Sequence, residues 1–253
     1  MIIAITSGKG GVGKTTISVN VATLLSFMGK TLIVDGDVAL PNVHVMLGIE
    51  SETSLPEVLK NFELLDSAIY QLEFHIKGKR AKLHVLPSST SLRALGDLRL
   101  EKFPELMESL RERYDYIIID VAAGLSKLSL FPMFSADKIY IVVNPEKASI
   151  EDGKRVVKTA LSSKMKVSGV IVNRYKGERE LATTAQKEVH EELAGIVRES
   201  KLVRKSWEES VPFVVKNPSS AVSKDVAKLA KNIAGIKTEI KKYGKLKYFL
   251  RLA

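Results

Sequence analysis

The stretch Gly8-Lys9-Gly10-Gly11-Val12-Gly13-Lys14-Thr15 decides the fold of this 253-residue chain. It matches the pattern G-x-x-x-x-G-K-[ST] and lies between the short apolar run Ile2–Ile5 and a segment with helical spacing of apolar residues. In such a unit the glycines turn backbone N–H groups toward phosphates, and the helix start adds a favourable dipole. Lys14 would reach the β- and γ-phosphates and Thr15 would hold Mg²⁺. The stretch therefore predicts a nucleoside-triphosphate site.

Outward from this loop, short apolar strands alternate with helices. The expected strands are Ile2–Ile5, Thr31–Val34, Leu83–Leu86, Tyr116–Ile119, Lys138–Val143 and Val167–Val172, with shorter candidates at Gly195–Val197 and Phe213–Val215. The expected helices follow the loop as far as Gly29, run from Pro104 to about Arg113, cover Ile150–Leu161 and include Val222 to Ile233. This alternation predicts an α/β protein of the P-loop NTPase type, with a mostly parallel twisted sheet and helices on both faces.

Composition narrows the class of protein. The chain is 45% hydrophobic and 27% charged, which excludes a disordered chain, and no apolar run reaches the roughly 18 residues of a membrane span. It has no Cys, which excludes disulfides and thiolate metal sites, so we expect a cytoplasmic location. The net charge is +10, and it is unevenly placed: residues 151–253 have a net charge of +11 and residues 1–150 a net charge of −1. This asymmetry favours an anionic lipid surface or a nucleic acid as partner, although a solvated lysine-rich surface would also account for it.

A second lysine inside the loop, Lys9, makes the match more specific. K-G-G-V-G-K-T-T resembles the deviant Walker A motif of the MinD/ParA family of P-loop ATPases. Ile33–Asp37 is similar to the family's switch I segment, and Tyr114–Asp120 followed by Ala123-Gly124 is similar to its Walker B and switch II segments. The order and spacing of these motifs fit the MinD branch better than other members.

The resemblance implies a role for each matched residue. Lys9 would reach across a nucleotide-sandwich homodimer to the partner's phosphates, and Asp37 would position the attacking water. With Lys14 they form the expected catalytic set, and Thr15, Asp35 and Asp120 are the residues expected around Mg²⁺. The expected ATP- or ADP-binding residues are Gly8, Lys9, Gly10, Gly11, Val12, Gly13, Lys14, Thr15, Thr16, which would donate to the α-phosphate, and Asn173, which would contact the adenine.

The last residues form a segment of different character. We expect a P-loop ATPase domain over 1–236 and a basic amphipathic tail over 237–253, which holds six basic residues and Glu239 as its one acid. On a helix, Leu246, Phe249 and Leu250 of Lys245–Ala253 would share one face, which is typical of an interfacial membrane anchor. The tail also resembles the membrane-targeting tail of MinD and predicts peripheral association with an anionic membrane. The alternative is a final helix packed on the protein's own core.

Other functions stay open at this point. A ParA-like partition ATPase would use the basic C-terminal part to bind DNA non-specifically, although DNA binding needs no Phe/Leu face. A metal-cluster carrier of the same superfamily is opposed by the absence of Cys. The family usually has a Pro where this chain has Ala122, which keeps open a nucleotide-gated scaffold with little hydrolysis. The family's I-P-E-D stretch reads Val197-Arg198-Glu199-Ser200 here, so no base-reading role is assigned to Arg198 or Glu199. The activating protein partner is not specified by the sequence.

Overall fold

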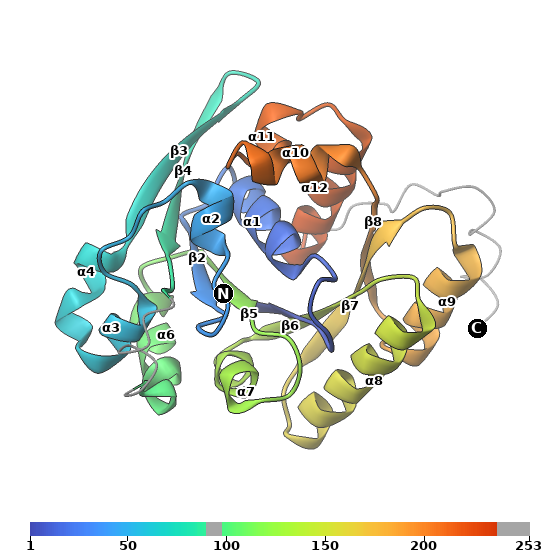
Figure 1. Ribbon diagram of the computed structural model, residues 1–253, viewed down its shortest axis with the longest axis horizontal. Helices are drawn as coiled ribbons and strands as arrows, with labels where there is room; N and C mark the ends of the chain where they lie inside the picture. The colour runs from blue at the N-terminus through green and yellow to red at the C-terminus, as the bar shows by residue number, and fades with distance from the viewer. Residues whose placement is uncertain (90–97, 237–253) are drawn as a thin grey trace.

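A computed structural model of the chain, which describes residues 1–89 and 98–236, contains one eight-stranded sheet with the strand order β3-β4-β2-β5-β1-β6-β7-β8 (Figure 1). All neighbouring strands are parallel except β3, which runs antiparallel to β4. The strands are β1 Ile2–Thr6, β2 Thr31–Gly36, β3 Tyr70–Ile76, β4 Lys79–Leu86, β5 Tyr116–Val121, β6 Lys138–Val143, β7 Val167–Tyr175 and β8 Leu193–Arg198.

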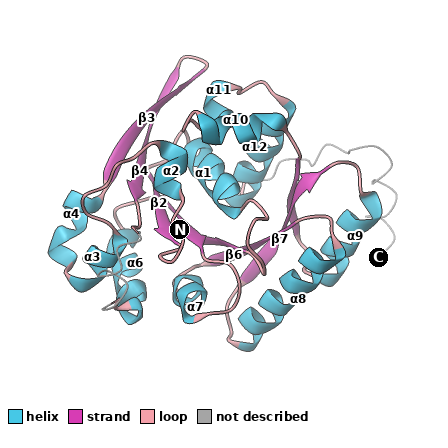
Figure 2. Cartoon of the chain, in the orientation of Figure 1, coloured by secondary structure: helices cyan, strands magenta, loops and turns pink. Residues whose placement is uncertain are grey.

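Helices cover both faces of the sheet, which confirms the expected α/β architecture (Figure 2). One face packs on α1 Lys14–Leu25, α2 Val43–Leu47, α11 Phe213–Lys216 and α12 Ala221–Ile233, with α10 Lys201–Glu208 on the same side. The other face packs on α3 Leu55–Lys60, α4 Leu65–Ala68, α6 Phe103–Arg111, α7 Lys127–Phe134, α8 Lys147–Ser162 and α9 Arg179–Glu188. Two 3₁₀ turns occupy Phe62–Leu64 and Leu100–Lys102. The central strands are buried on both faces, as their near-continuous apolar sequences require.

The segment Phe213–Val215, expected to be a strand, is part of the short helix α11 instead. Phe213 and Val214 are buried in the same core cluster as α1 and α12, and the backbone N–H of Val214 donates to Asn20 Oδ1 of α1 at 3.2 Å. A three-residue apolar run fits a buried helical turn as well as a strand, and here its packing against two helices decides the conformation.

The helix after the loop is shorter than expected. It ends at Leu25, and a turn over Ser26–Met28 carries the chain to Gly29. Gly29 does not adopt a left-handed conformation, so it does not end the helix as a capping glycine would. The close approach of Asp115 requires it, because a Cβ at Gly29 would lie 2.8 Å from Asp115 Oδ2.

The hairpin of β3 and β4 extends the sheet beyond the expected Leu83–Leu86. Its two turn residues, Lys77 and Gly78, have φ values of 48° and 77°, which is the geometry of a type I′ hairpin turn. Lys-Gly is a weaker hairpin signal than Asn-Gly, so the turn was not expected, although the alternation of apolar and polar residues over Tyr70–Ile76 is typical of a strand.

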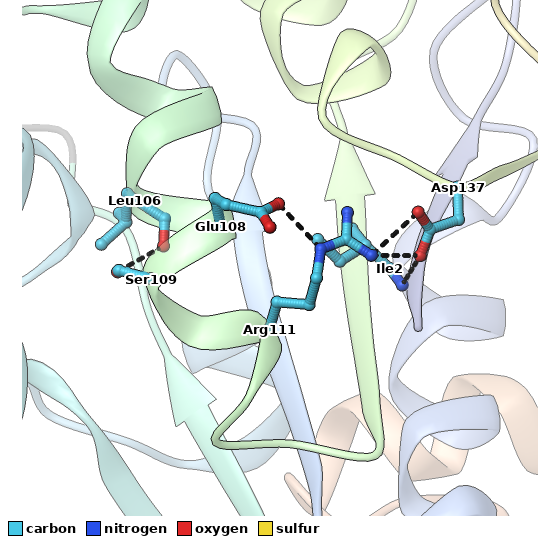
Figure 3. A network of polar contacts seen from close by, with 6 residues as sticks. All are labelled: Ile2, Leu106, Glu108, Ser109, Arg111 and Asp137. Atoms are coloured by element: carbon cyan, nitrogen blue, oxygen red, sulfur yellow. Dashed lines mark hydrogen bonds and ion pairs between the residues drawn. The ribbon is translucent and has the colours of Figure 1, made fainter.

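Polar contacts anchor α6 at the end of the sheet where β1 begins (Figure 3). Arg111 Nη1 donates to both carboxylate oxygens of Asp137 at 3.0 Å, and the backbone N–H of Ile2 donates to Asp137 Oδ2 at 2.7 Å. Burial alone would raise the pKa of Asp137, but the Ile2 N–H and Arg111 outweigh it and lower that pKa.

None of the described helices has the length and apolar character needed to cross a bilayer. The tail proposed over 237–253 lies outside the described residues.

Candidate functional site

The glycine-rich loop runs from the end of β1 into the first turn of α1, as its sequence predicts. Gly11 and Gly13 have φ values of 76° and 94°, a left-handed conformation that glycine adopts without strain. Gly13 also passes close to β7, because a Cβ there would lie 2.4 Å from Asn173 Nδ2. That amide donates to the carbonyl of Val12 at 2.8 Å, so Asn173 fixes the loop. Its contact with adenine stays a prediction.

Asp120 is the last residue but one of β5 and lies directly behind the loop. Its Oδ2 accepts a hydrogen bond from Thr15 Oγ1 at 2.6 Å, and its Oδ1 accepts one from Ser18 Oγ at 2.8 Å. Burial raises the pKa of Asp120, while Lys14 and the two hydroxyl groups act in the opposite direction. The Thr15 hydroxyl and the Asp120 carboxylate are hard oxygen groups, which Mg²⁺ prefers, so the residues present fit a magnesium ion shared with phosphates and water.

Asp35 lies beside Asp120, since the two residues are register partners on β2 and β5. It is fully buried, and burial together with the nearby Asp120 carboxylate raises its pKa well above the usual value. Asp35 accepts backbone N–H groups from Asp37, Asn42 and Val43 at 3.2, 3.0 and 2.9 Å. Its carboxylate therefore shapes the loop after β2, and its expected place around Mg²⁺ stays a prediction.

A pocket of about 720 Å³ opens at the carboxyl ends of the strands, where ligands bind in folds of this kind. Asp37 lines it, and one of its oxygens also accepts the N–H of Leu40 at 3.2 Å, which closes a turn. Lys14 is only 8% exposed and Thr16 only 6%. The pocket collects eight of the expected site residues: Gly10, Gly11, Gly13, Lys14, Thr15, Thr16, Asp37 and Asn173.

The remaining expected residues lie around this pocket without lining it. Lys9 points to the surface, where its Nζ lies 3.2 Å from Glu146 Oε2. Gly8 packs against the backbone of α8, because a Cβ there would lie 2.4 Å from the carbonyl of Asp152. Val12 is itself part of the loop, and its side chain is buried in the core.

Three contacts of the site were not predicted from the sequence. Ser18 shares Asp120 with Thr15, and its place three residues along the same helix was the available signal. Trp207 Nε1 donates to Thr16 Oγ1 at 3.0 Å across 191 residues of sequence, for which no local signal exists. Arg198 lines the pocket, where Asp225 holds its guanidinium through contacts of 2.6 and 3.0 Å.

The site combines a mostly parallel sheet, this glycine-rich loop, a lysine and a threonine in a pocket, and an aspartate behind the threonine. This combination defines a P-loop nucleotide-binding protein. Comparisons with known proteins agree. A family profile described as an AAA domain matches residues 1–169. An uncharacterized ATP-binding protein of Methanocaldococcus jannaschii is 34% identical over 94% of this chain and 89% of its own length. The septum site-determining protein MinD of Neisseria meningitidis is 31% identical over 84% of this chain and 83% of its own length.

The structure of MinD from Pyrococcus horikoshii, complexed with Mg-ADP, superposes with a TM-score of 0.82 and 32% identity, covering 94% of this chain and 99% of that one. The chain belongs to the MinD/ParA family of P-loop ATPases, and within it to the MinD branch. The resemblance inferred from the Lys9-containing loop is thereby confirmed.

Proposed function

We propose that this chain binds ATP with Mg²⁺, dimerises around the nucleotide and hydrolyses it, and that the nucleotide state controls association with an anionic membrane. The observation that carries the proposal is the Thr15–Asp120 hydrogen bond of 2.6 Å beside the buried Lys14 and the pocket-lining Asp37. Lys14 supplies a cation for the phosphates, and Thr15 and Asp120 supply two hard oxygen groups. Together with the carboxylate of Asp37, they are the groups that phosphoryl transfer to water requires.

Each residue has a separate task in this scheme. The loop N–H groups and Lys14 hold the phosphates, while Thr15 and Asp120 would hold Mg²⁺, which neutralises phosphate charge when bound. Asp37 lies at the pocket wall with a carboxylate that can orient a water molecule. Lys9 is on the surface of the loop, so it can leave Glu146 and reach the phosphates of a second subunit, as a cation supplied in trans does in related reactions.

Membrane association is assigned to Lys245–Ala253. Each buried CH₂ contributes about 0.8 kcal/mol and each cation near anionic lipid about 1 kcal/mol, and ordering the peptide opposes both. One tail therefore binds weakly, whereas two tails on one dimer gain from effective concentration.

Sedimentation with anionic vesicles and, separately, with DNA tests this function, each with ATP or ADP. We expect vesicle binding that rises with ATP and anionic lipid, falls with salt and is lost on deletion of Lys245–Ala253 or on Phe249→Glu. Tyr248→Phe, which keeps an aromatic ring, should bind as the unaltered chain does. Retention on DNA without vesicle binding would replace this function with a ParA-like one, and binding to neither would assign the tail to the protein's own core.

A further inference from the structure

Trp207 ties the C-terminal half of the chain to the nucleotide loop. It is the single tryptophan of the sequence, lies on α10 and lines the pocket beside Phe213. Its indole N–H donates to Thr16 Oγ1 in the first turn of α1 at 3.0 Å. A second tie, from the backbone N–H of Val214 to Asn20 Oδ1, joins α11 to the same helix one turn further on. The two hydrogen bonds hold α10 and α11 in register with the helix that begins at the loop.

The direction of the Trp207 hydrogen bond matters for the Thr16 hydroxyl. An indole nitrogen is a donor only, so Thr16 Oγ1 must accept with a lone pair and keeps its own proton for another acceptor. Among residues 1–89 and 98–236, no group accepts that proton. Thr16 lines the pocket and is only 6% exposed, so its hydroxyl is largely shielded from water. The hydrogen bond from the Trp207 indole N–H occupies one lone pair of that hydroxyl and so limits the directions in which its O–H can point.

We infer that Trp207 is a positioning residue for nucleotide binding: its N–H fixes the Thr16 hydroxyl so that the hydroxyl donates to a phosphate oxygen of the bound nucleotide. The inference rests on the proposed ATP site and adds a residue from α10 to it. A hydroxyl that rotates freely loses entropy when it binds, whereas one already oriented by an indole N–H loses less. The indole ring also forms an apolar part of the pocket wall, so nucleotide binding changes its surroundings.

Two variants separate the hydrogen bond from the packing of the ring. Trp207→Phe keeps an aromatic ring and removes the N–H, and Thr16→Val keeps the shape of threonine and removes the hydroxyl. A neutral hydrogen bond contributes about 1 kcal/mol, so Trp207→Phe should weaken Mg-ADP binding about fivefold in calorimetry. In turnover assays, KM should rise by a similar factor with kcat nearly unchanged, since the hydrogen bond acts on binding.

The double variant gives the decisive result. If Trp207 acts through the Thr16 hydroxyl, Trp207→Phe causes less than a twofold further loss of affinity in the Thr16→Val background. Equal losses in both backgrounds would overturn the inference and leave Trp207 as a packing residue. The unaltered chain should also show a change in tryptophan emission that is half complete at the dissociation constant found by calorimetry, and no change would likewise overturn the inference. Failure of the unaltered chain to bind Mg-ADP at all would instead refute the proposed function.

Discussion

Gly8→Ala should destabilise the protein although the backbone of Gly8 is in a conformation open to any residue. Gly8 has no left-handed φ, but a Cβ there would lie 2.4 Å from the backbone carbonyl carbon and oxygen of Asp152 in α8. Ordinary contact begins at 3.4 Å, so the loop and α8 would have to separate by about 1 Å. Backbone atoms of a helix cannot rotate away as a flexible side chain can.

The expected magnitude follows from two opposing effects. Overpacking of this kind costs about 1–3 kcal/mol, and the smaller entropy of unfolded alanine returns about 0.4–1 kcal/mol. The net loss of about 1–2 kcal/mol corresponds to a Tm lower by about 3–6 °C for a chain of this size. Gly10→Ala is the matched control, because Gly10 also lacks a left-handed φ and its Cβ would meet no atom within 4 Å.

Thermal unfolding of the nucleotide-free proteins, followed by far-UV circular dichroism, measures both variants. Gly10→Ala should unfold at or slightly above the Tm of the unaltered chain. If Gly8→Ala were as stable as Gly10→Ala, the close packing of the loop on α8 would be refuted, and with it the explanation of why this position needs glycine.

Two further outcomes are expected. Asp37→Ala should bind ATP but lose hydrolysis, and it should accumulate as an ATP-bound dimer in sedimentation. Asp37→Asn can still accept the Leu40 N–H and should lose turnover equally. Normal turnover in both variants would show that Asp37 only closes its turn. Asp137→Asn should lower the free energy of unfolding by about 1 kcal/mol at neutral pH, a value discounted for the partial exposure of the Arg111–Asp137 pair. Because the pKa of Asp137 is lowered in the folded protein, this stabilisation is complete above the unfolded pKa and is lost as the pH falls through the folded value, below 3.8. Urea unfolding at a series of pH values checks this, and a difference that persists at the acid end would contradict it.

The sequence specified which segments form the central sheet, because those strands are continuous apolar runs. Their carboxyl ends lie further along than expected, since β2 and β5 each continue through the aspartate and end one residue beyond it. Asp35 and Asp120 could still be placed at one edge of the sheet, because each follows such a run, and the structure makes them register partners. The loop conformation could also be predicted from its motif, since Gly11 and Gly13 are the loop residues with positive φ.

Features that depend on tertiary contacts could not be predicted in this way. The run Phe213–Val215 has no periodicity of its own, and its helical form comes from packing on α1 and α12. The Trp207–Thr16 hydrogen bond joins residues that only the complete fold brings together. Strand β3 is a different case, because Tyr70, Leu72, Phe74 and Ile76 alternate with polar residues, a local strand pattern that was available in the sequence.

Calorimetry with ATP and Mg²⁺ tests the central claim, which is that the loop of Gly8 to Thr15 holds a nucleotide through Lys14. The unaltered chain should bind one nucleotide per chain, and Lys14→Ala should lose more than tenfold in affinity, because a buried cation no longer balances the phosphate charge. Lys158→Ala, which removes an exposed lysine of α8 and changes the net charge equally, should bind normally. Unchanged affinity in Lys14→Ala would contradict the assignment of this pocket as the nucleotide site.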